Sequence, residues 1–383
     1  MKLKDILPFK ERISLSYDMN AVSSVLTGLT LGLILFYFYG LSDFFSHGHH
    51  AYNVTREHPW GFLVAAYEFF VAVAMGSVVI GASAIFFEID VLKPLIKRLL
   101  IFGLLSLFAG FTAFLFEIGH PVTMVIYSAI SGNPTSALFW LGVFYPLFML
   151  FTVLTFIAYH REMKSVKTLA MFAIIFANSS VLTAGSIFGN LNARLFTSGI
   201  FYQIEFLATA ILGGIFLLTL ITALFKREDF TEAVLALKKV SIAIISLLVI
   251  MYLVRYISGV YGGVPERADT IHHIFTSSNF LVFELGLGLA LPLLVAVFGA
   301  KDKIGLYCLA SFFGLVGIMF SRVNLIEGMQ LAPMQPLQTK VYESTSTLLT
   351  SYTPSATELG IGLGAIGMYI LFMFLSERIL DLD

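Results

Sequence analysis

Residues 60–87 read WGFLVAAYEFFVAVAMGSVVIGASAIFF, and this stretch decides the class of the fold. Its one charged side chain is Glu68. The run is longer than the roughly 20 apolar residues of helix that cross the hydrocarbon core of a bilayer. The stretch therefore predicts a membrane-spanning helix that carries a carboxyl group about eight residues from its first end.

The rest of the chain repeats this pattern. Hydrophobic residues make up 58% and charged residues 12% of the 383 residues, whereas a soluble domain has about 25% charged residues. We therefore predict an all-α polytopic membrane protein of about ten spans, with a tail at residues 1–19 and a membrane domain at residues 20–380. The expected spans are residues 20–41, 60–87, 98–118, 136–159, 168–190, 200–225, 240–260, 278–299, 304–325 and 355–376.

Lysine and arginine residues predict the orientation of the chain. Most of the 23 lie in the N-terminal tail and in the short connections on the same side of the spans. The positive-inside rule then makes both termini cytoplasmic, which an even number of spans also requires. The long connections, near residues 42–59, 119–135, 261–277 and 326–354, are expected outside. A net charge of −1 offers no basic face for nucleic acid.

Ionisable side chains within spans are candidates for function, because burying them in lipid is costly. At about 1.5 Å per residue of helix, seven of them fall in the outer half of the membrane. We expect a polar pocket between helices near the outer face, with arginine–carboxylate pairing. Glu117, Arg322 and Glu358 lie within about a turn of the surface, and the alternative for them is an interfacial side chain that reaches water. The seven are Glu68, Glu117, Glu205, Arg255, Glu284, Arg322 and Glu358.

Several cofactors are disfavoured by the residue types. None of the eight histidines falls in the middle of a span, so the paired ligands of membrane haems are missing. Cys308 is the only cysteine, and an iron–sulphur cluster needs about four thiolates. The run His47-Gly48-His49-His50 fits a solvated loop better than a metal site, since no partner ligands are spaced with it.

A set of short motifs resembles one membrane family. Pro59-Trp60-Gly61 opens the second span, and Glu117-Ile118-Gly119-His120-Pro121 ends the third. With the later motifs, these resemble the NrfD or polysulphide-reductase membrane subunits over about residues 55–380. The late motifs are similar to the ten-span branch that includes the quinone-reactive subunits of periplasmic nickel–iron hydrogenases. The later motifs are Asn133-Pro134-Thr135-Ser136, Leu253-Val254-Arg255-Tyr256, Ser321-Arg322 and Tyr352-Thr353-Pro354-Ser355 with Glu358.

The chain departs from the family pattern at three points. Glu117 stands where the family has aspartate, and His120 where it has arginine, so both positions keep a similar chemistry. Related hydrogenase subunits can carry a histidine near the stretch that corresponds to Thr183-Ala184-Gly185-Ser186, which has none. Another group would then bond a quinone oxygen in this chain.

The resemblance implies NrfD-like four-helix bundles in a prokaryotic cytoplasmic membrane. It implies a quinone-binding subunit, for menaquinone or ubiquinone, with no haem, metal or iron–sulphur cluster of its own. It also implies an extracytoplasmic ferredoxin-like iron–sulphur partner and a catalytic subunit of the nickel–iron or molybdenum type.

The polar pocket and the resemblance together suggest roles for individual residues. Glu117 and His120 are expected at the outer edge of the site, Glu68 and Glu205 as proton carriers, and Arg255 as an anchoring group. The candidates for contact with the quinone are Tyr67, Tyr202, Gln203, Arg322 and Glu358.

Two other functions remain open at this point. A proton-coupled secondary transporter would also have ten spans, but its polar groups belong at the midplane, on broken helices. The chain could also be an inert anchor for a catalytic subunit. Substituting its buried charged residues would then affect assembly but not the turnover of the assembled complex. The sequence does not determine the catalytic partner, the direction of electron flow or whether protons are pumped. Few polar residues lie in the inner half of the spans, which disfavours a pump.

Overall fold

The computed structural model describes residue 10 and residues 21–225, 227–300, 303–332 and 349–383. This part of the chain is helical and contains no strand. Ten helices in it are long and apolar enough to cross a membrane, as the sequence predicts. Most of the expected N-terminal tail lies outside the described residues.

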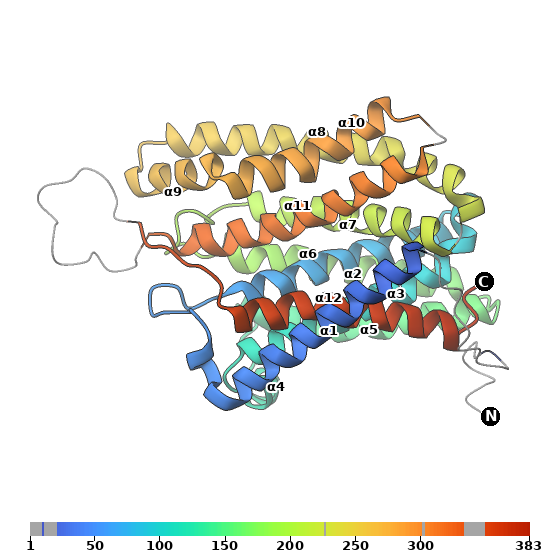
Figure 1. Ribbon diagram of the computed structural model, residues 1–383, viewed down its shortest axis with the longest axis horizontal. Helices are drawn as coiled ribbons and strands as arrows, with labels where there is room; N and C mark the ends of the chain where they lie inside the picture. Colours follow the sequence, from blue (N-terminus) through green and yellow to red (C-terminus); the bar gives the residue numbers. More distant parts are fainter. Residues whose placement is uncertain (1–9, 11–20, 226, 301–302, 333–348) are drawn as a thin grey trace, which may run out of the picture.

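The long helices lie side by side along the long axis of the molecule (Figure 1). Helix α1 begins and α12 ends at the same end of the bundle, which agrees with an even number of crossings. The opposite end is called the outer end below, as the positive-inside rule assigns it. The ten spans are α1 (Ala21–His47), α2 (Phe62–Phe86), α3 (Ile96–Glu117), α5 (Ala137–His160), α6 (Val166–Gly189), α7 (Phe201–Phe225), α8 (Phe230–Val260), η5 with α10 (Asn279–Ala290 and Leu291–Phe298), α11 (Ile304–Gln330) and α12 (Ala356–Ile379).

Short helices join the spans at both ends of the bundle. At the outer end, α4 and α9 occupy connections that the sequence predicts to be long outer loops. The seventh span begins about ten residues before its expected start, because the segment with Lys238 and Lys239 is helical. The short helices are η2 (Gly48–Ala51), η3 (Asp90–Leu95), α4 (Pro121–Ile130), η4 (Arg227–Asp229) and α9 (Pro265–Thr276).

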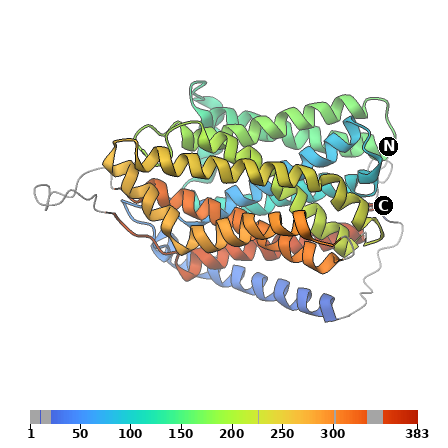
Figure 2. The same ribbon diagram turned by 90° about the horizontal axis from the view of Figure 1, so that it is seen from above.

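The spans form two groups of four. Helices α2, α3, α5 and α6 pack together as a first bundle, and α7, α8, η5–α10 and α11 pack as a second. The bundles meet where α7 packs against α2 and α6. Helices α1 and α12 form a separate pair, with α12 against the first bundle and α1 at the edge of the molecule (Figure 2).

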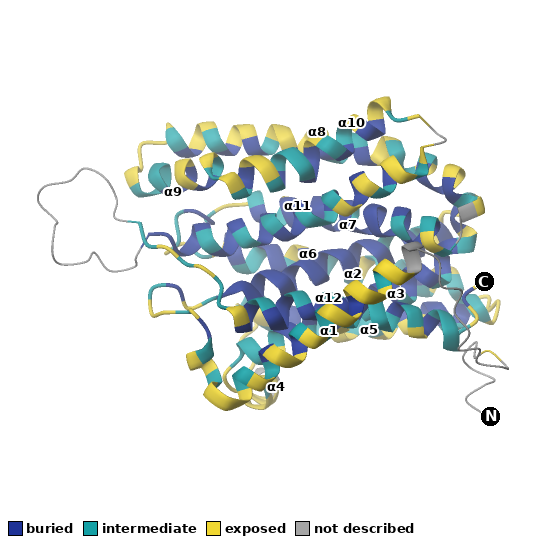
Figure 3. Ribbon diagram, in the orientation of Figure 1, coloured by how far each residue is buried: buried dark blue, intermediate teal, exposed yellow. Residues whose placement is uncertain are grey.

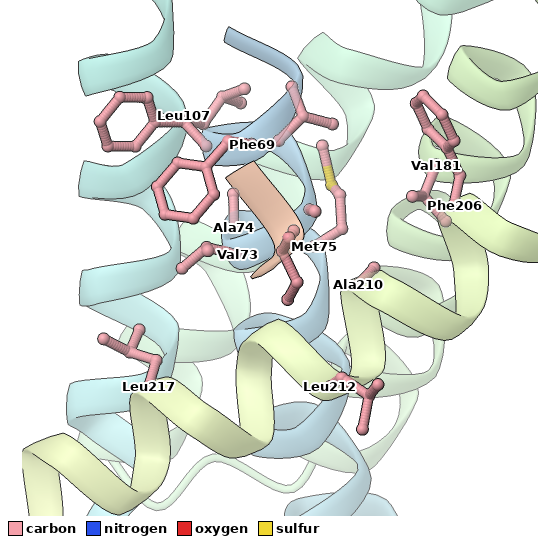
Figure 4. Close-up of a cluster of buried hydrophobic side chains, with 14 of the residues drawn as sticks. Phe69, Val73, Ala74, Met75, Leu107, Val181, Phe206, Ala210, Leu212 and Leu217 are labelled. Atoms are coloured by element: carbon pink, nitrogen blue, oxygen red, sulfur yellow. The ribbon is translucent and has the colours of Figure 1, made fainter. Parts of the chain in front are cut away.

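The core lies around α2. Nearly all side chains of this helix are buried, whereas α1 and α8 expose apolar side chains on the surface expected to face lipid (Figure 3). Apolar side chains of α2, α3, α6 and α7 fill the junction of the two bundles (Figure 4). A Cβ atom at Gly76 of α2 would overlap the carbonyl oxygen of Ala210 on α7. Glycine at this crossing therefore lets the two backbones touch, as in other membrane helix pairs.

Candidate functional site

A buried ion pair joins two helices of the second bundle. Arg322 on α11 is fully buried and donates from Nη1 to Oε2 of Glu205 on α7, at 2.7 Å. Its Nη2 donates to Oγ1 of Thr209 at 2.6 Å, one helical turn further along α7. The guanidinium carbon also lies 3.8 Å from the centroid of the Phe206 ring. This geometry offsets part of the cost of burying the pair.

A second buried carboxyl group lies near this pair, on α2, which packs against both α7 and α11. Glu68 is buried on α2, and its charge interacts with those of Arg322 and Glu205. Its Oε2 atom has no hydrogen-bond partner among the described residues. The structure thus brings Glu68, Glu205 and Arg322 together at the junction of the bundles. The sequence places these three at similar depth but does not pair them.

A third buried carboxyl group lies further into the second bundle. Glu284 accepts a hydrogen bond from the Tyr252 hydroxyl at 2.6 Å and another from Nδ2 of Asn324 at 2.5 Å. Its helix, η5, is a π-helix of 12 residues. Segments of π-helix are rare and occur frequently at functional sites. Asn324 lies two residues after Arg322, so α11 contributes to both carboxylate environments.

A small cavity lies between these groups. Its free volume is about 20 Å³, enough for a water molecule but not for a ring. Three buried atoms on its lining residues have no partner among the described residues: Oε1 of Glu205, Oδ1 of Asn324 and Nε of Arg255. One donor and two acceptors in one cavity are the partners that a bound water needs.

Arg255 forms one wall of the cavity. Its guanidinium carbon lies 4.2–5.0 Å from the ring centroids of Phe196, Phe201 and Tyr202. It donates a hydrogen bond to the carbonyl oxygen of Phe196, and another to the Tyr202 hydroxyl at 3.3 Å. Arg255 and Tyr202 therefore lie at the same site. The cation is enclosed by aromatic faces and has no carboxylate among these hydrogen-bond partners.

The first bundle holds a buried tyrosine pair beside Glu68. The Tyr67 hydroxyl on α2 donates to the Tyr145 hydroxyl on α5 at 2.8 Å. The Tyr67 ring stacks on Phe114, with centroids 4.3 Å apart. Tyr145 is absent from the residues suggested by the sequence. Its depth could have indicated it, because Tyr145 lies about eight residues from the outer end of α5. The sequence places Glu68 at about the same depth in its own span.

Glu117 lies at the outer end, at the entry to α2. Its Oε1 accepts the backbone N–H of Gly61 at 3.0 Å, next to the first residue of the helix. Its Oε2 is buried and has no partner among the described residues. His120, expected beside it, is exposed and precedes α4. The structure therefore gives Glu117 a capping contact as well as one free acceptor.

Glu358 holds the chain before α2 at Asn53, and Gln330 holds it at Trp60. Glu358 accepts the backbone N–H groups of Asn53 at 3.0 Å and Ser355 at 2.8 Å, and the Tyr352 hydroxyl. Gln330 pairs with both backbone groups of Trp60, at 2.9 Å each. Several segments thus converge on residues 60–62, and Glu358 has its carboxylate occupied by backbone and tyrosine donors. The sequence gives no reason to single out Gln330, because glutamine is common near the ends of membrane spans.

Gln203 lies where α6 and α7 cross near the outer end. A Cβ atom at Gly189 would lie 2.5 Å from the side-chain amide of Gln203. Its side chain is therefore packed against the end of α6, away from the cavity beside Arg255, whose lining does not include it.

His58, in an outer loop, has a pKa that is shifted by burial. Nε2 of His58 lies 2.6 Å from Oγ1 of Thr350. Burial, with the nearby charge of Arg194, lowers the pKa of His58. This histidine therefore stays neutral further into the acid range than an exposed one.

Two polar side chains towards the inner half of the spans are bonded within their own helices. Ser77 donates to the Val73 carbonyl at 2.6 Å, and Asn178 donates to the Ile174 carbonyl at 3.0 Å. At the inner end, buried Arg98 pairs with Glu377 at 2.6 Å, a contact that the sequence did not suggest. Within the described residues, no group of three or more His, Cys, Asp or Glu side chains could hold a metal ion.

A second hollow lies on the outer surface of the first bundle, between α5 and α6. Its volume is about 420 Å³, and it is open at the surface. Its lining residues are Pro134, Thr135, Ala137, Trp140, Phe144, Thr183, Ser186 and Asn190.

Comparison with known proteins gives a family match. Residues 50–333, more than half of the chain, match the family model described as "Polysulphide reductase, NrfD". The chain is also similar to one of the subunits of the selenate reductase of Mesobacillus selenatarsenatis, with 23% identity over 371 residues. That alignment covers 85% of this chain and 86% of the relative.

Proposed function

The chain belongs to the NrfD family of polysulphide reductase membrane subunits, and on that premise we propose that it is the quinone-reactive subunit of a respiratory oxidoreductase complex. It exchanges electrons between the membrane quinone pool and an iron–sulphur partner subunit docked on the outer end. The similarity to a protein that is named as one subunit of a selenate reductase supports a complex of several subunits. The catalytic subunit is of the molybdenum or nickel–iron type.

The observation that carries the proposal is the group of Glu68, Glu205 and Arg322 buried at the junction of the bundles. Reduction of a quinone takes up two electrons and two protons, and oxidation of the quinol releases them. A site within the membrane therefore needs protonatable groups that exchange with water. Two buried carboxyl groups lie near one guanidinium, so ionising both would leave an unpaired buried charge. Glu205 holds the ion pair, and we assign the exchangeable proton to Glu68.

The neighbouring side chains suggest how protons move between Glu68 and its surroundings. The Tyr67–Tyr145 hydroxyl pair lies beside Glu68 in the first bundle. The cavity next to Glu205 can hold water that reaches towards Glu284. Glu117, at the outer edge, retains one carboxylate oxygen without a partner among the described residues. Glu117 and the exposed His120 are suited to exchange protons with water outside.

Isolation of the intact complex tests the assembly that this function requires. The tag belongs at the N-terminus, because Leu382 is buried and Arg98 bonds the carbonyl of Leu382 and the side chain of Asp383. Purification in mild detergent should recover an iron-containing partner together with molybdenum or nickel. A chain that purifies alone and free of metal in several detergents would contradict the proposal and favour a transporter.

A further inference from the structure

We propose that the short helix α4 is inserted in the outer leaflet of the bilayer, with lipid on all its sides. The sequence predicts an outer loop between the third and fourth spans. In the structure, part of this connection is α4 (Pro121–Ile130), which lies at the edge of the molecule near the outer end of the bundle (Figure 1). The inference depends on how the chain sits in the membrane and not on quinone chemistry.

The connection that contains α4 carries no charged side chain. No Asp, Glu, Lys or Arg lies between Glu117 and Arg161. The other long outer connections contain such residues, and α9, the second short outer helix of more than one turn, includes Glu266 and Arg267. Moving a charged side chain into lipid is costly, whereas apolar residues enter it readily. This connection can therefore enter the bilayer at a lower free-energy cost than the others.

The side chains of α4 are exposed around the whole helix. Residues 122–127 are six consecutive exposed positions, and at about 3.6 residues per turn they cover every side of the helix. Val122, Val125 and Tyr127 are 70%, 65% and 62% exposed. Among the described helices, α4 makes few contacts with the others, whereas α9 buries one side against the second bundle. Whatever covers α4 therefore lies outside this chain.

Exposure on all sides distinguishes lipid from a protein as the surroundings of α4. A docked protein, whether a partner subunit or a second copy of this chain, covers one face of a helix and leaves the opposite face in water. Val125 and Tyr127 lie about 200° apart around the helix, so one protein surface does not cover both. Lipid chains can surround a helix, and they remove the apolar side chains on every side from water.

The neighbouring spans place α4 at the level of the outer leaflet. Helix α3 has 22 residues and ends at Glu117, so at about 1.5 Å per residue it is long enough to cross a hydrocarbon core of about 30 Å. Helix α4 begins shortly after this end. Exposed apolar side chains continue from Leu115 on α3, through α4, to Leu138 at the start of α5. Insertion of α4 would thus extend the lipid-facing surface and keep Glu117 and His120 at the boundary between lipid and water.

Fluorescence quenching in the intact complex, reconstituted into liposomes, tests the surroundings of α4. In a Cys308→Ser background, Val125→Cys and Tyr127→Cys each carry a bimane label. Lipids brominated on their acyl chains are expected to quench both labels, and aqueous iodide is expected to quench neither. Leu253→Cys, on the exposed surface of α8, is the control for lipid. Arg56→Cys, exposed in an outer loop, is the control for water.

Two results would overturn the proposal. Quenching of either label by iodide would place that side of α4 in water. Protection of either label from both quenchers would indicate that a protein covers that side. Neither result would affect the proposed function, because turnover with quinone tests that function separately.

A charged substitution provides an independent test of what holds the helix. Val125→Asp is expected to move α4 out of the lipid, because a carboxylate is unfavourable there. A label at Tyr127→Cys should then lose quenching by brominated lipid and become quenched by iodide. Asn133→Asp is the matched control, since Asn133 is exposed in the loop after α4, and it should leave the label in lipid. Lipid quenching that persists in Val125→Asp would overturn the proposal.

Discussion

At the scale of single residues, Arg322 is a fully buried cation. It is a guanidinium with no exposed surface, held by Glu205, Thr209 and the Phe206 ring. Removing one partner of such a pair leaves an uncompensated buried charge, which costs about 3–5 kcal/mol. Replacing both partners by neutral groups avoids that cost.

We therefore predict that Arg322→Met lowers stability by about 3–5 kcal/mol, and that the double variant with Glu205→Gln recovers most of the loss. The measurement is the thermal unfolding midpoint of each complex in detergent. If the double variant is no more stable than Arg322→Met, the two residues do not act as an ion pair.

A substitution of Glu68 tests its proposed role as a proton carrier. Glu68→Gln keeps the shape of the side chain but cannot carry a proton. We expect quinone-dependent turnover to fall about 100-fold, within the usual range for a lost acid–base group. Turnover with a dye at the catalytic subunit should not change. Parallel loss of both activities would indicate an assembly defect and favour an inert anchor.

Depth along the spans allowed the sequence to place Glu68, Glu205 and Arg322 in one half of the membrane. Their pairing could not be derived, because it depends on how α2, α7 and α11 are rotated about their axes. Tyr145, Thr209 and Asn324 were missed for a related reason. Tyrosine, threonine and asparagine are tolerated at many positions of membrane helices, so their partners matter more than their presence.

At the scale of elements, the π-helix η5 is the feature that the sequence did not predict. Hydropathy identifies an apolar helix but does not distinguish α from π hydrogen bonding. In the structure, Gly288 of η5 lies against Gly317 of α11, and a Cβ atom at Gly288 would be 2.6 Å from the Gly317 Cα. This contact brings η5 close to α11, where Glu284 meets Asn324.

We predict that Gly288→Ala separates the two helices and lowers stability by about 1–3 kcal/mol, the usual cost of overpacking. Gly305→Ala on α11 is the control, because a Cβ atom there meets nothing within 4 Å. Thermal unfolding of both variants provides the comparison. Equal midpoints for the two variants would mean that the close crossing is not required.

The outer loops lead to a prediction about pH. Because burial lowers the pKa of His58, this histidine binds a proton less tightly in the folded protein than in the unfolded chain. Stability should therefore be retained above the ordinary histidine pKa of about 6.5 and decline as the pH falls below it. His58→Gln should make the unfolding midpoint less dependent on pH between about 7 and 5. An identical slope in the variant would assign the effect to other groups.

At the scale of the whole molecule, the number of spans and the common side of their termini follow from hydropathy and charge. The division into two bundles does not, because each span is apolar around most of its circumference. Packing of the spans depends on small residues at particular crossings, such as Gly76 and Gly364. A Cβ atom at Gly364 would overlap that of Tyr37, so the glycine keeps α12 close to α1. The family match ends at residue 333, before α12 begins, so this outer pair lies largely beyond the shared core.

In the proposed function, this chain connects a catalytic partner to the quinone pool. The most direct measurement is turnover of the purified complex with a quinone and with a dye, in preparations with and without this chain. We predict that loss of the chain lowers quinone-dependent turnover at least about 100-fold and leaves dye-dependent turnover unchanged. Quinone-dependent turnover that persists without the chain would contradict the account.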